Sequence, residues 1–151
     1  MEFVTNETSY DLDSMVIDLN WTLTVWGEIE NAVIDSLQKL QNLWWNLYLL
    51  TWNQRWNADI FEKYWLEIIK VKNAQEKEDF VLSLDTKKCV AIWNARIDIG
   101  MFKHAEISIA TLQAEWIHSK ILDYADIIVP SMNDALSLFI DKDRFCATMK
   151  I

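Results

Sequence analysis

An aspartate directly after a short apolar run is the first candidate for chemistry in this sequence. Asp18 follows residues 14–17, and a carboxylate in that place can attack phosphorus and form an aspartyl-phosphate. Thr51 ends a second apolar run, and Asp98 lies shortly after a third. Phosphoryl transfer depends on positioning and charge neutralisation, so a site of this kind also needs positive charge close to Asp18.

The elements that must position these side chains alternate along the chain. Short apolar runs predict strands over residues 14–18, 47–51, 67–71, 89–92, 107–110 and 126–130. Helices are expected over residues 28–41, 57–64, 74–84, 99–104, 118–124 and from Met132 onward. Continuous apolar strands separated by helices predict a parallel sheet that is covered on both faces. We therefore expect one doubly wound, Rossmann-like α/β domain over residues 1–151, with its site beyond the carboxyl ends of the strands.

Composition and charge argue against several classes of protein. The net charge of −9, from 14 basic and 23 acidic residues, disfavours binding to a nucleic-acid backbone. The apolar runs are too short to span a bilayer, and the first residues carry neither the basic nor the apolar region of a signal peptide. Cys89 and Cys146 lack metal-ligand spacing and are expected to be reduced. These features predict a cytoplasmic protein without membrane or nucleic-acid partners.

Four segments, in order, resemble the motifs of the haloacid dehalogenase-like (HAD) superfamily. Val16-Ile17-Asp18-Leu19-Asn20-x-Thr22-Leu23 resembles motif I, Asp-x-Asp-Gly-Thr, with Asn20 at the second Asp, as in the small soluble relatives of P-type ATPases. The other three are similar to motifs II, III and IV: Leu49-Leu50-Thr51, Gln75-Glu76-Lys77-x-x-Phe80-Val81 and Val90-Ala91-Ile92-x-Asn94-x-x-x-Asp98. The resemblance extends over residues 11–149 and leaves no room for a cap domain.

The resemblance implies a Mg²⁺-dependent phosphatase-like hydrolase with an open site and a phosphorylated substrate. It makes Asp18 the nucleophile, and it leaves the oligomeric state open, a homo-oligomer included. The implied catalytic residues are Asp18, Asn20, Thr51 and Lys77. The implied substrate-binding residues are Thr22, Thr51, Trp52 and Lys77. The implied magnesium ligands are Asp18, the backbone carbonyl of Asn20, Asn94 and Asp98.

Asn20 departs from the family pattern in a way that concerns turnover. The resembled phosphatases use the second Asp of motif I to protonate the leaving group and then to activate water. Asn20 cannot titrate, so it cannot act as a general acid or base. This predicts slow hydrolysis, a substrate with a good leaving group, or transfer to an alcohol. The alternative is a catalytically impaired module that binds phosphate or a protein.

Each candidate also has a purely structural interpretation. Asp18, Thr51 and Asp98 could cap helix N-termini, as short polar side chains often do. Lys77 could lie on a solvated helix face. The four motifs in order weigh against these interpretations for Asp18 most strongly and for Thr51 least.

The counts of glycine and tryptophan are unusual. The chain has 2 glycines and 9 tryptophans, whereas about 7% of residues are glycine in an average protein. Several tryptophans stand where the resemblance or a helix end asks for glycine: Trp21, Trp56, Trp65, Trp93 and Trp116. One hypothesis is that UGA codons read as glycine, as in some bacterial lineages, were translated as tryptophan. The alternative is a Trp-rich variant, in which Trp44 or Trp45 is a core residue and Trp21 and Trp93 crowd the site.

Overall fold

The centre of the molecule is a six-stranded sheet in which every strand runs parallel to its neighbours. The computed structural model describes residues 1–52, 58–113 and 117–150. The strand order is β5-β4-β3-β6-β7-β8. The bounds are β3 Ser14–Asp18, β4 Asn46–Thr51, β5 Glu67–Lys70, β6 Cys89–Trp93, β7 Ile107–Thr111 and β8 Ile127–Val129. The first strand of this sheet in the chain, β3, lies near its middle, and the later strands are added toward both edges, which confirms the predicted doubly wound α/β fold.

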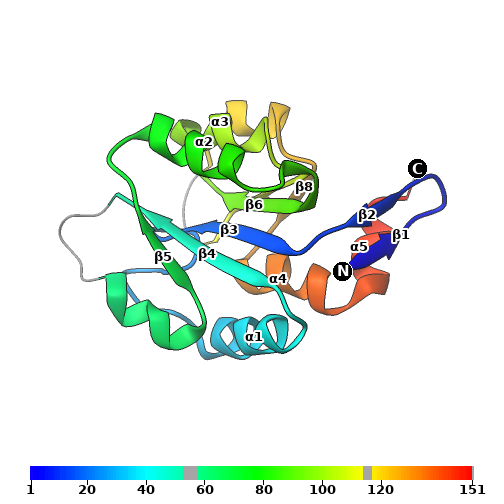
Figure 1. The fold of residues 1–151 in the computed structure, drawn as a ribbon, viewed down its shortest axis with the longest axis horizontal. Coiled ribbons are helices and arrows are strands. Elements are labelled where there is room, and N and C mark those ends of the chain that lie inside the picture. The colour runs from blue at the N-terminus through cyan, green and yellow to red at the C-terminus, as the bar shows by residue number, and fades with distance from the viewer. Residues whose placement is uncertain (53–57, 114–116, 151) are drawn as a thin grey trace.

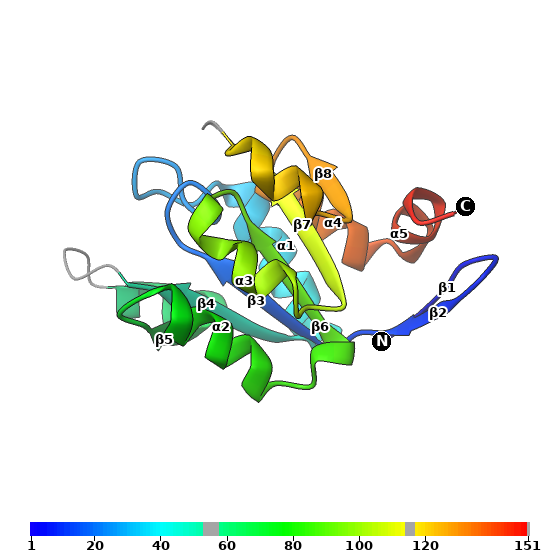
Figure 2. The same ribbon diagram turned by 90° about the horizontal axis from the view of Figure 1, so that it is seen from above.

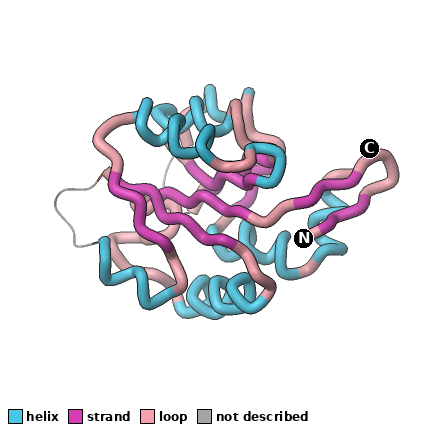
Figure 3. Tube along the Cα trace, in the orientation of Figure 1, coloured by secondary structure: helices cyan, strands magenta, loops and turns pink. Residues whose placement is uncertain are grey.

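Helices cover both faces of the sheet, as Figures 1 and 3 show. One face carries α1 (Asn31–Asn42), η1 (Ala58–Tyr64), α4 (Met132–Ile140) and α5 (Lys142–Thr148). The other carries α2 (Ala74–Ser83), α3 (Ile99–Phe102) and η4 (Ser119–Asp123). Two short 3₁₀ turns, η2 (Thr86–Lys88) and η3 (Arg96–Asp98), flank β6. Both layers are visible at once in Figure 2.

The two hydrophobic clusters explain why the strands are apolar throughout. Successive side chains of a strand point to opposite faces. In β3, Met15 and Ile17 pack into the cluster under α1 and α4, whereas Val16 packs into the cluster under α2 and α3. All three are fully buried, so each side of the sheet gains a separate hydrophobic core.

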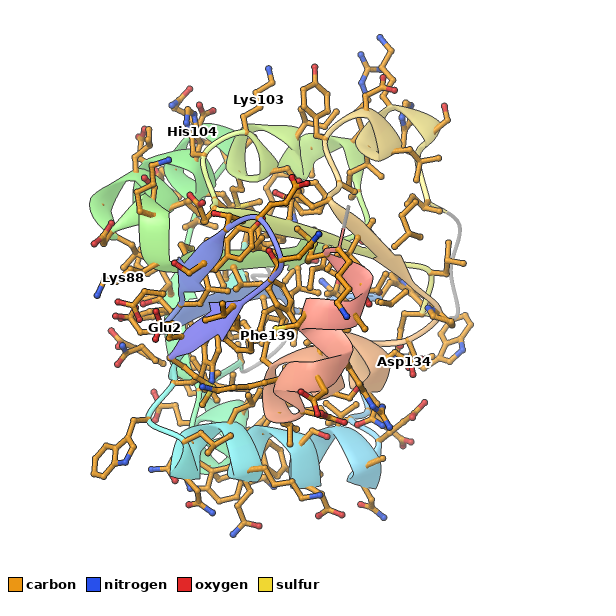
Figure 4. All side chains as sticks on the ribbon, turned by 90° about the vertical axis from the view of Figure 1, so that its right-hand side faces the viewer. Glu2, Lys88, Lys103, His104, Asp134 and Phe139 are labelled. Atoms are coloured by element: carbon orange, nitrogen blue, oxygen red, sulfur yellow. The ribbon has the colours of Figure 1, made fainter. Side chains whose placement is uncertain are left out.

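An N-terminal hairpin was not expected from the sequence. Strands β1 (Glu2–Val4) and β2 (Ser9–Asp11) pair in antiparallel fashion and pack against α5. The ring of Phe3 lies 4.9 Å from that of Phe145 and 5.8 Å from that of Phe139, centroid to centroid. Figure 4 views this end of the molecule, with Phe139 between the hairpin and the last helix. Strands of three residues are too short to give a period of two in the sequence.

Two predicted helices differ from the structure. The stretch from Met132 onward forms two helices, because Asp141 interrupts the first and its carboxylate caps α5 by accepting from the Asp143 amide. The helix predicted from Glu28 begins at Asn31, because Glu28 pairs with Val25 in a tight turn.

Only one of the two tryptophans proposed for the core lies there. Trp45 is 5% exposed and packs on Phe139, with ring centroids 5.3 Å apart. Trp44 is 90% exposed, so of the two alternatives it is Trp45 that is the core residue. Trp56 and Trp116, two of the proposed glycine positions, lie outside the described residues.

Both cysteines are free, Cys89 buried in β6 and Cys146 partly buried in α5. Within residues 1–52, 58–113 and 117–150, no helix combines the length and the apolar character needed to cross a membrane.

Candidate active site

The predicted site residues gather where β3, β4 and β6 end. Asp18 is the last residue of β3 and pairs in register with Leu50, so Thr51 lies one position further along the neighbouring strand. On the other side of β3, Ile17 pairs with Ile92, and Asn94 directly follows the end of β6. The sheet changes its winding direction between β3 and β6, which is the usual place for a ligand in such folds.

A buried lysine joins the two predicted acidic residues. The Nζ atom of Lys77 donates to Oδ1 of Asp18 at 2.9 Å and to Oδ1 of Asp98 at 3.0 Å. The exposed fractions of the three side chains are 3% for Lys77, 15% for Asp18 and 1% for Asp98. Lys77 therefore lies in the interior and not on a solvated helix face, which was its alternative interpretation.

Helix α2 positions Lys77 through a defined start. The side chain of Asn73 caps the helix by accepting from the Glu76 amide at 2.9 Å. The Glu76 carboxylate in turn accepts from the Lys72 amide at 2.8 Å. These two bonds fix the first turn of α2, and Lys77 follows directly on the side that faces the sheet.

Burial shapes the charge of this cluster. Burial raises the pKa of Asp18 against the opposing pull of Lys77. Burial, together with the negative charge of Asp18, raises the pKa of Asp98 to about 7 although Lys77 opposes the shift. Burial lowers the pKa of Lys77, but the two carboxylates outweigh it and leave that pKa raised. Lys77 thus stays protonated, and its single charge serves two acidic groups.

The second oxygen of Asp98 fits a metal ligand. Its Oδ2 atom is buried and finds no hydrogen-bond partner within the described part of the chain. A buried oxygen in that state is costly unless a cation or a donor approaches it. Within the same residues, no three His, Cys, Asp or Glu side chains cluster for a metal. A cation here would therefore use the carboxylates of Asp18 and Asp98 with amide, carbonyl and water oxygens, a set that suits Mg²⁺.

Asn94 ties the loop after β3 to the end of β6. Its Nδ2 donates to the carbonyl of Trp21 at 3.3 Å, and its Oδ1 accepts from the hydroxyl of Thr22 at 3.4 Å. Asn94 and Thr22 are 4% and 0% exposed, so the bond between their side chains is shielded from water. The geometry gives these two residues a positioning role, and their predicted roles toward metal and substrate stay predictions.

Asn20 lies apart from the ion pairs. It is exposed and lines a pocket of about 280 Å³ together with Trp21, Thr24, Trp26 and Gly27. The indoles of Trp21 and Trp26 meet edge to face in this pocket, with centroids 4.7 Å apart. The loop that lines this hollow begins directly after Asp18 in the chain.

Two aromatic rings lie near the lysine. The Lys77 Nζ atom is 4.7 Å from the ring centroid of Trp93 and 5.6 Å from that of Trp52. Trp52 was predicted at the site, whereas Trp93 was considered a glycine position. Trp93 is fully buried as the last residue of β6. The predicted strand ended at Ile92, but the apolar run continues into Trp93, and this signal could have placed Trp93 in the strand.

Solved structures share this fold over most of their length. A 3-deoxy-D-manno-octulosonate 8-phosphate phosphatase from Moraxella catarrhalis, solved with magnesium, phosphate and the sugar acid, has a TM-score of 0.72 at 14% identity, over 91% of this chain and 93% of that one. The cobalt-bound phosphatase of that name from Haemophilus influenzae has a TM-score of 0.72 at 11% identity, over 92% and 93%. A Legionella pneumophila protein described as a putative HAD superfamily hydrolase has a TM-score of 0.71 at 13% identity, over 91% of this chain and 87% of that one.

The class of the protein follows from this likeness. The chain has the HAD-like α/β fold, and its described residues form no separate cap domain. It belongs to the same family as Uncharacterized protein MJ0073 of Methanocaldococcus jannaschii, with 33% identity over 89 residues, 59% of this chain and 94% of that protein. No family model matches the chain.

Proposed function

We propose that the chain is a single-domain, Mg²⁺-dependent phosphatase that works through an aspartyl-phosphate on Asp18. The observation that carries the proposal is the buried Lys77, bonded to Asp18 at 2.9 Å and to Asp98 at 3.0 Å at the carboxyl end of the sheet. A lysine held there can neutralise negative charge on the nucleophile and on a bound phosphoryl group, as phosphoryl transfer needs.

The reaction has two steps, and both use Asp18. In the first, a carboxylate oxygen of Asp18 bonds to phosphorus, and the bond between phosphorus and the leaving oxygen breaks. The leaving oxygen takes its proton from solvent, because Asn20 has none to give. In the second, water attacks the phosphorus, inorganic phosphate leaves and the carboxylate is restored. Lys77 stays protonated in both steps and offsets the negative charge on the acyl phosphate.

The metal would be held by the two acidic residues of the cluster. Asp18 and Asp98 would supply carboxylate oxygens, with the carbonyl of Asn20 and the side chain of Asn94 as further ligands. Bound Mg²⁺ supplies positive charge against the phosphate oxygens. The buried, partnerless Oδ2 of Asp98 supports this assignment.

Phosphorylated small molecules are the first substrates to test. The fold neighbours named above include phosphatases of an eight-carbon sugar acid phosphate, crystallised with magnesium or cobalt. A site with no cap over it also admits larger phosphorylated substrates. Since Asn20 cannot assist the leaving group, esters with acidic leaving groups, such as aryl phosphates, should turn over fastest.

The deciding experiment measures phosphate release from an aryl phosphate with and without Mg²⁺. The chain as written is compared with Asp18→Asn and with Asp123→Asn, an exposed carboxylate outside the site. We expect Mg²⁺-dependent release that Asp18→Asn abolishes and Asp123→Asn leaves unchanged. Activity that survives Asp18→Asn contradicts the nucleophile. Phosphate binding without turnover in any form would favour the binding module suggested by Asn20.

A further inference from the structure

Four tryptophans occupy a backbone conformation that side chains of their size rarely adopt. Among the described residues, φ is 58° at Trp21, 54° at Trp26, 67° at Trp44 and 65° at Trp65. Gln113, at 22°, is the fifth residue other than glycine with positive φ there. Large side chains in the left-handed region are outliers, whereas glycine enters it without steric cost. Four of the seven described tryptophans share this conformation, so chance is a poor explanation.

Trp44 stands at the glycine position of a Schellman motif. Helix α1 ends at Asn42 with Leu43 as its C-cap. The Trp44 amide donates to the Gln41 carbonyl at 3.0 Å, and the Trp45 amide donates to the Leu40 carbonyl at 3.2 Å. This pair of bonds defines the motif, in which glycine is the usual residue at the left-handed position and an apolar residue follows it.

Trp26 stands at the first central position of a hairpin turn. Val25 and Glu28 exchange amide-to-carbonyl bonds of 3.0 Å and 3.1 Å, so Trp26 and Gly27 form a two-residue loop. Their φ values are 54° and 81°. Positive φ at both central residues defines a type I′ turn, which favours Asn-Gly and Gly-Gly. Only the second position carries the expected glycine.

Trp21 and Trp65 are the other two tryptophans with positive φ, and each lies in a turn of the chain. The Trp21 amide donates to the Thr24 carbonyl at 2.8 Å, in the turn that directly follows the nucleophile strand. Trp65 ends the 3₁₀ helix η1, and its amide donates to the Glu62 carbonyl at 3.0 Å. Both positions are ones at which glycine is expected from the sequence alone.

Burial does not compensate for the strain at the most exposed positions. Trp44 is 90% exposed and Trp26 is 82% exposed, so these indoles gain little by leaving water. Trp45, next in the chain to Trp44, is the contrast. It has ordinary φ, is 5% exposed and packs on the rings of Phe3 and Phe139. The backbone therefore separates tryptophans that fit their positions from those that do not.

We infer that residues 21, 26, 44 and 65 are glycine in the protein that its source organism makes, through UGA codons read as glycine. Trp45 is a true tryptophan. The inference depends on backbone conformation and hydrogen bonds alone, so it stands or falls independently of the proposed phosphatase activity. It also changes the site, because glycine at 21 and 26 removes the two edge-to-face indoles that line the pocket beside Asn20.

The gene and the native protein give the direct test. We expect UGA at codons 21, 26, 44 and 65 and UGG at codon 45. We also expect peptide mass spectrometry of the protein from its source organism to give glycine at those four positions. UGG at the four codons, or tryptophan in the native peptides, overturns the inference.

A stability comparison tests the same point on recombinant protein. The chain as written is compared with a variant that carries Trp21→Gly, Trp26→Gly, Trp44→Gly and Trp65→Gly. We expect the quadruple variant to melt several degrees higher, because four strained positions are relieved. The matched control is Trp45→Gly, which removes a buried ring and should melt lower. A quadruple variant that melts no higher than the chain as written contradicts the inference.

Discussion

At the residue scale, the central feature of the site is one lysine, Lys77, that forms ion pairs with two aspartates. The resemblance to the four motifs predicted that Asp18, Lys77 and Asp98 belong to one site, and the structure brings their charged groups together at the carboxyl end of the sheet. The ring of Trp93 over Lys77 fits the alternative in which Trp93 crowds the site, whereas the glycine hypothesis gave that position no contact. The P-type-ATPase-like form of motif I stays a prediction.

The residue beside the nucleophile sets the speed of the proposed reaction. Asn20→Asp supplies the titratable group that the chain lacks, and general acid–base catalysis contributes about 10²–10⁴-fold. We expect kcat for alkyl phosphates to rise by that order, and kcat for aryl phosphates to rise less because their leaving group needs little help. Asn20→Ala is the matched control and should give no gain. Equal rates for the Asp and Ala variants would remove Asn20 from the account of slow turnover.

Metal binding can be measured through stability without any turnover. Mg²⁺ at about a hundred times its dissociation constant should stabilise the chain by about 2.7 kcal/mol, which is several degrees in Tm. Asp98→Asn should abolish this rise, whereas Asp123→Asn should keep it. A Tm that responds equally to Mg²⁺ in both variants would exclude Asp98 as a ligand.

The same measurement has a pH dependence with a defined sign. Burial raises the pKa of Asp98 to about 7, above its value in the unfolded chain. Without metal, between about pH 4 and 7, Asp98 is protonated in the folded chain but ionised in the unfolded chain. Its contribution to the free energy of unfolding therefore falls as the pH rises from about 4 to 7. Mg²⁺ needs the ionised carboxylate, so its effect on Tm should be larger at pH 8 than at pH 6. A smaller effect at pH 8 would contradict the assignment.

At the element scale, the capped start of α2 connects the fold to the chemistry. The predicted helix over residues 74–84 agrees with α2 to within one residue, because the capping residue and the apolar spacing are both local signals. The hairpin β1–β2 and the break at Asp141 could not be predicted in the same way. The hairpin depends on contacts with α5, which is distant in sequence, and the break interrupts an otherwise continuous apolar spacing.

The cap of α2 should matter for activity as well as for stability. Asn73→Ala removes the side chain that accepts from the Glu76 amide, which should lower the free energy of unfolding by about 1 kcal/mol. Because Lys77 follows in the next turn, kcat should also fall severalfold. Ser131→Ala removes the matching cap of α4, which carries no predicted site residue. It should cost similar stability with kcat unchanged, so equal effects of both variants on kcat would refute a positioning role for the cap.

At the scale of the whole molecule, the reactivity of the two cysteines measures how well the helices shield the sheet from solvent. Burial raises the pKa of Cys89 to about 12, while Cys146 is partly exposed on α5. The thiolate is the reactive form, so a maleimide at neutral pH should label one thiol in the native protein and two after unfolding. Cys146→Ser should remove the native labelling. Fast labelling of Cys89 in the folded chain would mean that the layer of α2 and α3 opens readily.

The contact between the hairpin and α5 imposes an order of events during synthesis. The Lys142 ammonium donates to the Glu2 carbonyl across 140 positions, and Phe3 packs against Phe145. Contacts between such distant segments form late, because a large loop must close first. The hairpin therefore leaves Phe3 and Tyr10 uncovered until α5 has also emerged from the ribosome. If translation stalled before α5, the nascent chain would expose the apolar side chains that α5 otherwise covers. Chaperones bind exposed apolar surface of this kind.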